Sequence, residues 1–234
     1  MFGEYEVTYK NEGSRQHGLL PVRRPSIPAP ERRVTETEIE GRDGFLIEDG
    51  ETWGPIVIPV EFNFMAPPER WGEVYRDAKK WLLKDTGNLQ FADDPHYFCK
   101  VLSCQITDSE RTSRKIGKFT AEFTCDPYTY MISGLQELDP EEEIFNYGEV
   151  SHPIYKITGN GDCTLTVNGK TMQATVGQNL TIDTDLMIAY REDGEMKNAT
   201  VTGNYEDLYL QEGDNEVSIT AGFGLKIIPN WRCI

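Results

Sequence analysis

The chain has 234 residues, enough for one large domain or two small ones with a buried core. Its formal net charge of −16 and its pI of about 4.6 argue against nonspecific binding to nucleic acid phosphates and to anionic membrane surfaces. No apolar run approaches the roughly 18 residues of a membrane helix, and residues 1–14 lack the pattern of a secretory signal, so we expect a soluble protein made in the cytosol.

The N-terminal part reads as a strand followed by an extended arm. Residues 4–9 alternate polar and apolar side chains, as a half-buried strand does, and a polar loop leads into the proline-rich run Pro21–Pro30. Proline fixes φ and has no N–H to donate, so we expect this run to be extended and outside any central strand. Such an arm can lie across a neighbouring molecule at a low entropic cost.

Two further strands are expected around a tight turn at Gly41–Gly44. Residues 34–39 favour a strand before the turn, and residues 56–64 alternate after it. One face of the second strand would carry Ile56, Ile58, Val60, Phe62 and Phe64. Residues 27–65 are therefore predicted to present backbone and side chains outward to a neighbour, with nothing arranged for chemistry.

One helix is predicted, over Pro68–Asp85. Proline is tolerated in the first turn of a helix because that N–H has no partner there. Apolar side chains recur at i, i+3, i+4 and i+7, which predicts one face buried on a sheet. These side chains are Trp71, Val74, Tyr75, Ala78, Trp81 and Leu82. Lysines gather at the C-terminal end, where cations complement the helix dipole, and Gly87 is placed to stop the helix.

A basic stretch separates the next two predicted strands, Tyr97–Thr107 and Lys118–Thr124. It covers residues 108–115 and is the one local concentration of positive charge. Two interpretations stay open: a solvated hairpin tip, or a docking contact for an acidic partner.

The composition changes after residue 130. Leu138–Glu143 is charged and contains a proline, which is typical of a linker. Short strands follow, with turn signals at Gly159–Asp162, Asn168–Gly169, Asp193–Gly194 and Gly213–Asn215. Their number and spacing are typical of an all-β sandwich. We predict an N-terminal domain over 1–138, a linker over 139–145 and a C-terminal domain over 146–234.

No motif points to catalysis or to a bound cofactor. The histidines, His17, His96 and His152, are far apart and outside any His-Glu-x-x-His frame, and no Gly-x-Ser-x-Gly elbow occurs. The pair Asp183 and Asp185 has the spacing of metal ligands, but 39 acidic residues make such a spacing common by chance. We predict no catalytic residue, no cofactor and no metal, and hence a protein that is not an enzyme.

The cysteines do not form a recognisable framework. There are five, an odd number, without any Cys-x-x-Cys pair, so neither a zinc site nor a disulfide is predicted. We expect reduced and mostly buried thiols. Cys163 and Cys233 could be neighbours in a sheet, and their pairing is left open.

The order of several motifs resembles that of siphophage distal tail proteins. In the front half these are Pro28–Arg33, Glu40–Gly44, Ile58–Phe62, the helix over Pro68–Asp85, and Gly117–Tyr128. In the rear half they are Asn146–Pro153, Thr181–Asp183, Asn198, Gly203–Tyr205, Leu210–Asn215 and Ile228–Arg232. No single motif is diagnostic, but together they cover nearly the whole chain.

The resemblance implies a structural protein of the virion, from a phage or a prophage. The fold would be mainly β: an α+β N-terminal domain with one main helix on a β-sheet, and a galectin-like C-terminal β-sandwich. The N-terminal domain would form a hexameric ring at the tail tip, assembled in the host cytoplasm, with a lumen for DNA. Its partners would be its own copies, the tail tube protein, the tail-associated hub or lysin protein and, in some phages, receptor-binding proteins. It would bind no specific nucleic acid and no membrane.

A second hypothesis is a carbohydrate- or cell-wall-binding module that aids adsorption to the host. The residues from Asn146 onward leave no room for the inserted carbohydrate-binding module of enlarged family members. The one tryptophan there, Trp231, lies in the terminal strand and suits a core. A third hypothesis, a tail-tip hydrolase, requires turnover of a cell-wall polymer.

The candidate subunit or partner interface rests on charged residues in two segments. They are Arg32, Arg33, Arg42 and Asp43 in the first segment, and Arg111, Arg114 and Lys115 in the second. Bidentate pairs between arginine and carboxylate suit an acidic ring that must associate with itself. The alternative is that these are solvated surface charges that contribute little.

Overall fold

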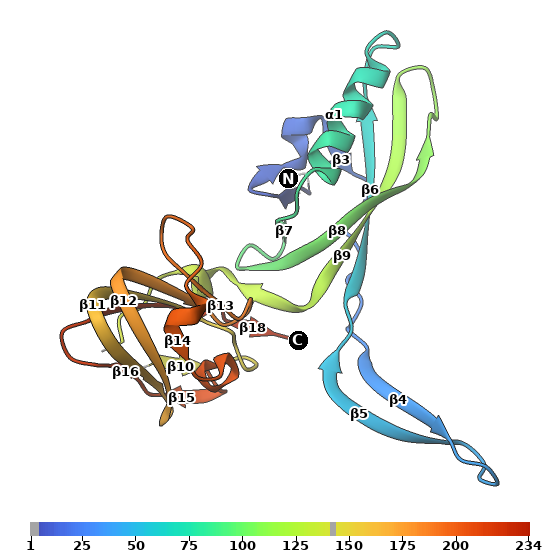
Figure 1. Ribbon diagram of the computed structural model, residues 1–234. Coiled ribbons are helices and arrows are strands. Elements are labelled where there is room, and N and C mark those ends of the chain that lie inside the picture. Colours follow the sequence, from blue (N-terminus) through green and yellow to red (C-terminus); the bar gives the residue numbers. More distant parts are fainter. Residues whose placement is uncertain (1–4, 141–143) are drawn as a thin grey trace. The chain divides into compact units, whose positions relative to one another are not determined.

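The computed structural model describes residues 5–140 and 144–234 (Figure 1). It is mainly β with a single α-helix among these residues, which confirms the predicted fold class. The chain divides into two compact units, residues up to 129 with Ile234 (unit 1) and residues 130–233 (unit 2). Part of the predicted linker, residues 141–143, lies outside the described residues, and the predicted domain roles stay a prediction.

Unit 1 is built on an antiparallel sheet with the strand order β2-β1-β7-β8-β9-β6-β3. The bounds are β1 Val7–Tyr9, β2 Glu12–Gly13, β3 Leu19–Pro21, β6 Ile56–Met65, β7 Asn88–Phe91, β8 Tyr97–Glu110 and β9 Ile116–Met131. A 3-10 turn, η1, covers Ser14–His17. The two strands predicted around the basic stretch are present and longer than expected: β8 continues from Thr107 to Glu110, and β9 is longer at both of its ends.

Helix α1 (Trp71–Leu83) lies within the predicted range and packs on the sheet as the spacing requires. Its buried face carries Ala78, Trp81 and Leu82. The ring of Trp81 meets that of Tyr9 edge-on at 5.9 Å, and Tyr9 in turn meets Phe123 of β9 at 5.1 Å. The helix thus closes the core of unit 1 over β1 and β9.

Strand β6 shows the predicted alternation. Ile56, Ile58, Val60, Phe62 and Phe64 are all buried, and the residues between them are not.

Pro59 of β6 lies opposite Glu122 of β9 and interrupts no hydrogen bond between these two strands. The carbonyl of Glu61 accepts the N–H of Val22 on the β3 side, and backbone groups two residues apart point to the same side of a strand. The nitrogen of Pro59 therefore faces away from β9.

A separate two-stranded hairpin joins β3 to β6 in the chain (Figure 1). It consists of β4 (Arg32–Glu38) and β5 (Phe45–Trp53), with the predicted Gly41–Gly44 turn between them. β5 was not predicted: the strand after this turn was expected at residues 56–64, which instead form β6 and pair with β9. Gly41 and Gly44 both have positive φ, 79° and 81°, which glycine adopts without steric cost.

Unit 2 is organised around one long hairpin, β11 (Ile154–Val167) paired with β12 (Lys170–Asp183) over their whole length. The shorter strands are β10 Ile144–Asn146, β13 Ile188–Tyr190, β14 Val201–Thr202, β15 Gly213–Asn215, β16 Val217–Ile219, β17 Gly224–Ile228 and β18 Arg232–Cys233. The 3-10 turns are η2 Ile132–Leu135, η3 Asn198–Thr200 and η4 Tyr205–Leu208. Strands β13 and β14 pair with β12, and β16 and β17 pair with β11.

Two of the predicted turns of unit 2 are wrong. β11 runs straight through Gly159–Asp162, because this stretch pairs with β12 residue by residue. Gly159 is required there for space, since a Cβ would lie 2.3 Å from the ring of Phe223. The stretch 213–215 is strand β15, paired with β10. The hairpin turn at Asn168–Gly169 is confirmed, with φ of 49° and 79°.

The five cysteines are all outside disulfide bonds, and three of them, Cys99, Cys125 and Cys163, are buried. Among the described residues, no helix has the length and apolar character needed to cross a membrane.

Candidate interaction surfaces

The hairpin of β4 and β5, residues 32–53, is here called the arm, and one of its faces combines apolar and acidic side chains. Every residue of β4 is exposed. Residues paired across two antiparallel strands point to the same face. The register pairs Val34 with Asp49, Glu36 with Ile47, and Glu38 with Phe45, so these six side chains share one face. We call it the docking face of the arm.

The apolar side chains of the docking face are open to solvent. Val34, Phe45 and Ile47 are 45%, 51% and 62% exposed. The opposite face carries Thr35 with Glu48, and Thr37 with Leu46. A hairpin of two strands is marginally stable alone in water, and neighbouring exposed apolar groups mark interaction sites. The arm is therefore a candidate contact for another molecule.

The four interface residues predicted in this segment all lie on the arm, in different settings. Arg32 is used within the hairpin: its Nε donates to Asp49 at 2.9 Å, and its guanidinium lies 5.3 Å from the ring of Trp53. Arg33 is exposed on β4, and Arg42 and Asp43 lie in the exposed turn. The sequence analysis named charged residues of the arm as an interface, which stays a prediction, and it did not name the apolar docking face. The alternation of Phe45 and Ile47 was the available signal.

The other three predicted interface residues lie on the β8–β9 connection, residues 111–115, here called the basic loop. The guanidinium of Arg111 lies 5.0 Å from the ring of Trp71 on α1 and donates to the carbonyl of Arg114 at 2.8 Å. The hydroxyl of Ser113 accepts the N–H groups of Lys115 and Ile116 at 3.2 and 3.1 Å. These contacts fix the loop and leave the charged groups of Arg114 and Lys115 without an ion-pair partner among the described residues.

An exposed apolar pair lies beside the basic loop. Met65 of β6 is paired with Ile116 of β9, and the two side chains are 72% and 37% exposed. The N–H of Ala66 donates to the carbonyl of Lys115 at 2.8 Å, which holds the end of β6 against the loop. Basic and apolar groups are thus adjacent here, as acidic and apolar groups are on the arm.

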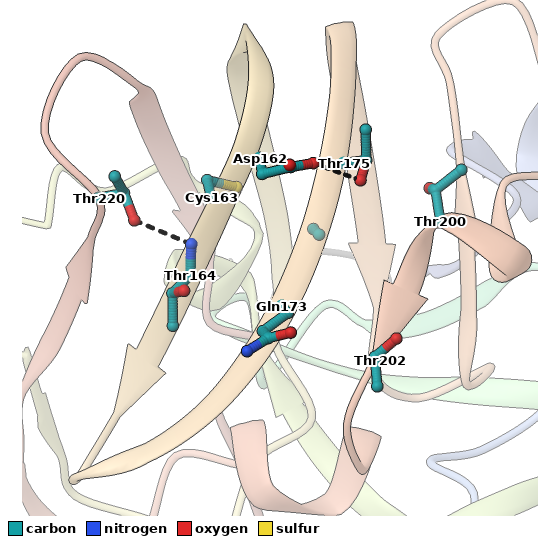
Figure 2. Close-up of a pocket in the computed structure, with 9 residues that line it drawn as sticks. Asp162, Cys163, Thr164, Gln173, Thr175, Thr200, Thr202 and Thr220 are labelled. Atoms are coloured by element: carbon teal, nitrogen blue, oxygen red, sulfur yellow. Dashed lines mark hydrogen bonds between the residues drawn. The ribbon is translucent and has the colours of Figure 1, made fainter.

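Unit 2 contains a polar groove of about 450 Å³ beside the β11–β12 hairpin (Figure 2). It is lined by Asp162, Cys163, Thr164, Gln173, Ala174, Thr175, Thr200, Thr202 and Thr220. The hydroxyl of Thr175 donates to Asp162 at 2.6 Å, and that of Thr220 accepts the N–H of Thr164 at 2.9 Å. Hydroxyl, carboxylate and amide groups can bind a ligand rich in hydroxyls. None of the nine lining residues is aromatic, so the lining offers no ring on which a sugar could stack.

Unit 2 also exposes two aromatic rings held on a rigid turn. Phe145 and Tyr147 are 39% and 84% exposed, with ring centres 4.4 Å apart. Asn146 between them is fully buried: its Nδ2 donates to the carbonyl of Glu149 at 2.8 Å, and its Oδ1 accepts the N–H of Gly148 at 3.0 Å. These bonds hold the backbone that carries both rings.

The histidine of unit 2 that contacts a carboxylate has both ring nitrogens engaged. His152 Nδ1 lies 2.9 Å from Asp185 Oδ1, and its Nε2 lies 3.0 Å from the guanidinium of Arg232. A guanidinium can only donate, so Nε2 accepts and Nδ1 carries the proton that is donated to Asp185. The ring also stacks on Tyr209 at 4.0 Å. Because a general base must present a free nitrogen to the reacting group, this arrangement supports a structural role.

The acidic pair Asp183 and Asp185 does not converge on one point. Asp183 Oδ1 accepts the N–H groups of Asp185 and Leu186, each at 3.0 Å, and so closes a local turn. The carboxylate of Asp185 faces His152 instead. Within the described residues, no group of three or more His, Cys, Asp or Glu side chains could hold a metal ion.

Comparisons with known proteins identify the fold. No protein-family model and no curated protein matches the sequence. The structure is similar to the crystal structure of the SPP1 Dit (gp 19.1) protein, described as a paradigm of hub adsorption apparatus in Gram-positive infecting phages. The TM-score is 0.66 at 13% sequence identity, and the match covers 98% of this chain and 99% of that one. This chain therefore has the fold of that phage protein over nearly its whole length.

Proposed function

We propose that this chain is a distal tail protein of a siphophage, a structural component of the tail tip. The observation that carries the proposal is the fold shared with the SPP1 Dit protein across 98% of the chain. The order of sequence motifs supports the same family independently of the fold. As a consequence, the protein would be located in the virion tail.

The arm and the basic loop support self-association into a ring. Unit 1 presents an apolar and acidic face on the arm, and a basic loop beside exposed Met65. Residues 1–138 would form a hexameric ring that joins the tail tube to the hub or lysin protein, and receptor-binding proteins could attach to it. The β-rich domain over 146–234, galectin-like in this proposal, would follow the linker 139–145. DNA would pass through the lumen, and a net charge of −16 per copy would keep its phosphates from adhering.

The proposed role is structural and needs no catalysis or cofactor. Both ring nitrogens of His152 are engaged in contacts with Asp185 and Arg232. The carboxylate of Asp183 instead accepts the backbone N–H of Asp185, so the two carboxylates have different partners. These contacts are of the kind that hold loops in place.

The test is the mass and shape of the purified full-length chain. Light scattering should give a species of about six times 26.6 kDa, and face-on electron microscopy should show sixfold particles with a central hole. A strict monomer at high protein concentration, or particles without sixfold symmetry, would contradict the ring.

A second candidate function is favoured by the polar groove, which could bind a neutral saccharide of the cell wall through its hydroxyl and carboxylate groups. Screening the full chain on a glycan array tests this. Binding that is lost in Asp162→Asn but kept in Asp193→Asn, an exposed aspartate outside the groove, would support it. Absence of binding to any glycan would remove it.

A further inference from the structure

The arm and the basic loop lie at opposite ends of one strand. The arm ends at Trp53, and β6 begins at Ile56; the basic loop adjoins the other end of β6, where Met65 pairs with Ile116 (Figure 1). A strand advances about 3.4 Å per residue, so the ten residues of β6 separate the two sites by about 30 Å. A contact between an arm and a basic loop of different copies is therefore head-to-tail, the geometry that generates rings or filaments.

The charges of the two sites are complementary. The arm, residues 32–53, contains seven carboxylates and three arginines. Residues 111–118 contain four basic side chains and no carboxylate, in a chain whose net charge is −16. On the docking face, Glu36 and Glu38 have no ion-pair partner among the described residues. At the basic loop the same holds for Arg114 and Lys115, so both sets are available for a contact between copies.

Both sites also carry exposed apolar side chains. Val34, Phe45 and Ile47 on the docking face are interleaved with its carboxylates. Met65 and Ile116 adjoin the basic loop. Stable protein interfaces have an apolar centre with a polar rim. Bringing the two sites together would bury the exposed apolar groups and place opposite charges around them.

We propose that the docking face of the arm binds the basic loop and the adjacent Met65–Ile116 pair of a second copy of this chain. This rests on the proposed function and names the two surfaces that would join neighbouring subunits of the ring. The second copy is preferred over an unrelated partner because this chain itself supplies both the acidic and the basic half of the contact.

The experiment uses three charge-reversed forms of the full chain. The arm variant carries Glu36→Lys and Glu38→Lys, and the loop variant carries Arg114→Glu and Lys115→Glu. Glu48→Lys is the matched control, because Glu48 lies on the same hairpin but on the opposite face. The arm and loop variants should each need on the order of 100-fold higher protein concentration to associate, because like charges then face one another. The control should associate as the unmodified chain does. Circular dichroism checks that each form is folded.

Mixing the two variants gives the sharper result. Neither variant can bind its own kind, but the lysine arm of one fits the glutamate loop of the other, and the remaining arm and loop are both unmodified. An equimolar mixture should therefore recover particles of the original mass, with the two variants alternating. An even number of subunits, such as six, permits this alternation.

The outcomes separate the inference from the proposed function. An unmodified chain that stays monomeric refutes the ring. An unmodified chain that forms rings, with arm and loop variants that do so equally well, overturns the docking contact and leaves the ring standing. Variants that fail alone and also fail when mixed overturn the pairing of these two surfaces.

Discussion

The guanidinium of Arg111 lies 5.0 Å from the centre of the Trp71 ring, and this contact joins the β8–β9 connection to the start of α1. The same guanidinium bonds to the carbonyl of Arg114, so one side chain positions most of the basic loop. A charged loop that is held in this way loses less conformational freedom when a partner binds it.

Replacing Arg111 by alanine should loosen the loop without unfolding unit 1. A cation–π contact near the surface contributes about 0.5–1 kcal/mol, so a small loss of stability is expected together with faster amide exchange over residues 111–115. Hydrogen exchange followed by mass spectrometry measures this. Arg114→Ala removes an equal charge without touching Trp71 and should leave the exchange unchanged; equal exchange in both variants would show that the ring contact does not hold the loop.

Two glycines of the β11–β12 hairpin should respond differently to alanine. At Gly159 the new Cβ would meet the Phe223 ring at 2.3 Å, and φ is 151°. Overpacking of this kind costs about 1–3 kcal/mol. Gly177 has open space around it, so its alanine variant should stay within about 1 kcal/mol of the unmodified chain. Urea denaturation compares the two, and equal midpoints would contradict the close approach of Phe223.

Asn146→Ala should destabilise unit 2, because it removes a buried side chain that bonds to the part-buried N–H of Gly148 and carbonyl of Glu149. An unsatisfied buried group costs about 1–3 kcal/mol. Urea denaturation measures the loss of stability, and amide hydrogen exchange over residues 146–149 reports the loosening of the turn. Asn160→Ala, at an exposed position of β11, is the control. A variant at Asn146 as stable as this control would mean that water replaces the lost bonds.

Glu61 should contribute to the decrease in the free energy of unfolding at acidic pH. The hydrogen bond from Lys118, together with the charge of Arg23, lowers the pKa of Glu61 below its ordinary value of 4.5. A depressed folded-state pKa stabilises the protein above pH 4.5, and this contribution is lost as the pH falls through the lower value. Denaturation at pH 6, 4 and 3 should show a smaller loss for Glu61→Gln than for the unmodified chain. If the variant and the unmodified chain lost equal stability, other carboxylates would account for the sensitivity to acid.

Periodicity was enough to predict the buried faces of β6 and α1. The alternation from Ile56 to Phe64 reappears as buried core residues. On α1, Ala78, Trp81 and Leu82 are buried, while the first three residues of the predicted face, from Trp71 to Tyr75, are partly buried against the core. These patterns are reliable because one side of each element is buried and the other is not.

Two features depended on contacts that are distant in sequence. Gly159 was interpreted as a turn because glycine is common in turns, but the ring of Phe223, 64 positions later, needs that space. The docking face of the arm was missed because the strand after the Gly41–Gly44 turn was expected at residues 56–64, whereas Phe45–Trp53 forms β5 and pairs with β4. The charged residues of the arm and the basic loop could be named from composition, but their relation through β6 required the fold.

Pro59 affects how copies of this chain can associate incorrectly through the edge of a sheet. β3 pairs with residues 62–64 of β6, and residues 23–26 line a hollow beside Pro59 at the same sheet margin. The nitrogen of Pro59 carries no hydrogen and points to that margin. A strand from another molecule that paired there would therefore lack one backbone hydrogen-bond donor at this position. Edge-to-edge pairing between copies of this chain is therefore hindered at this point.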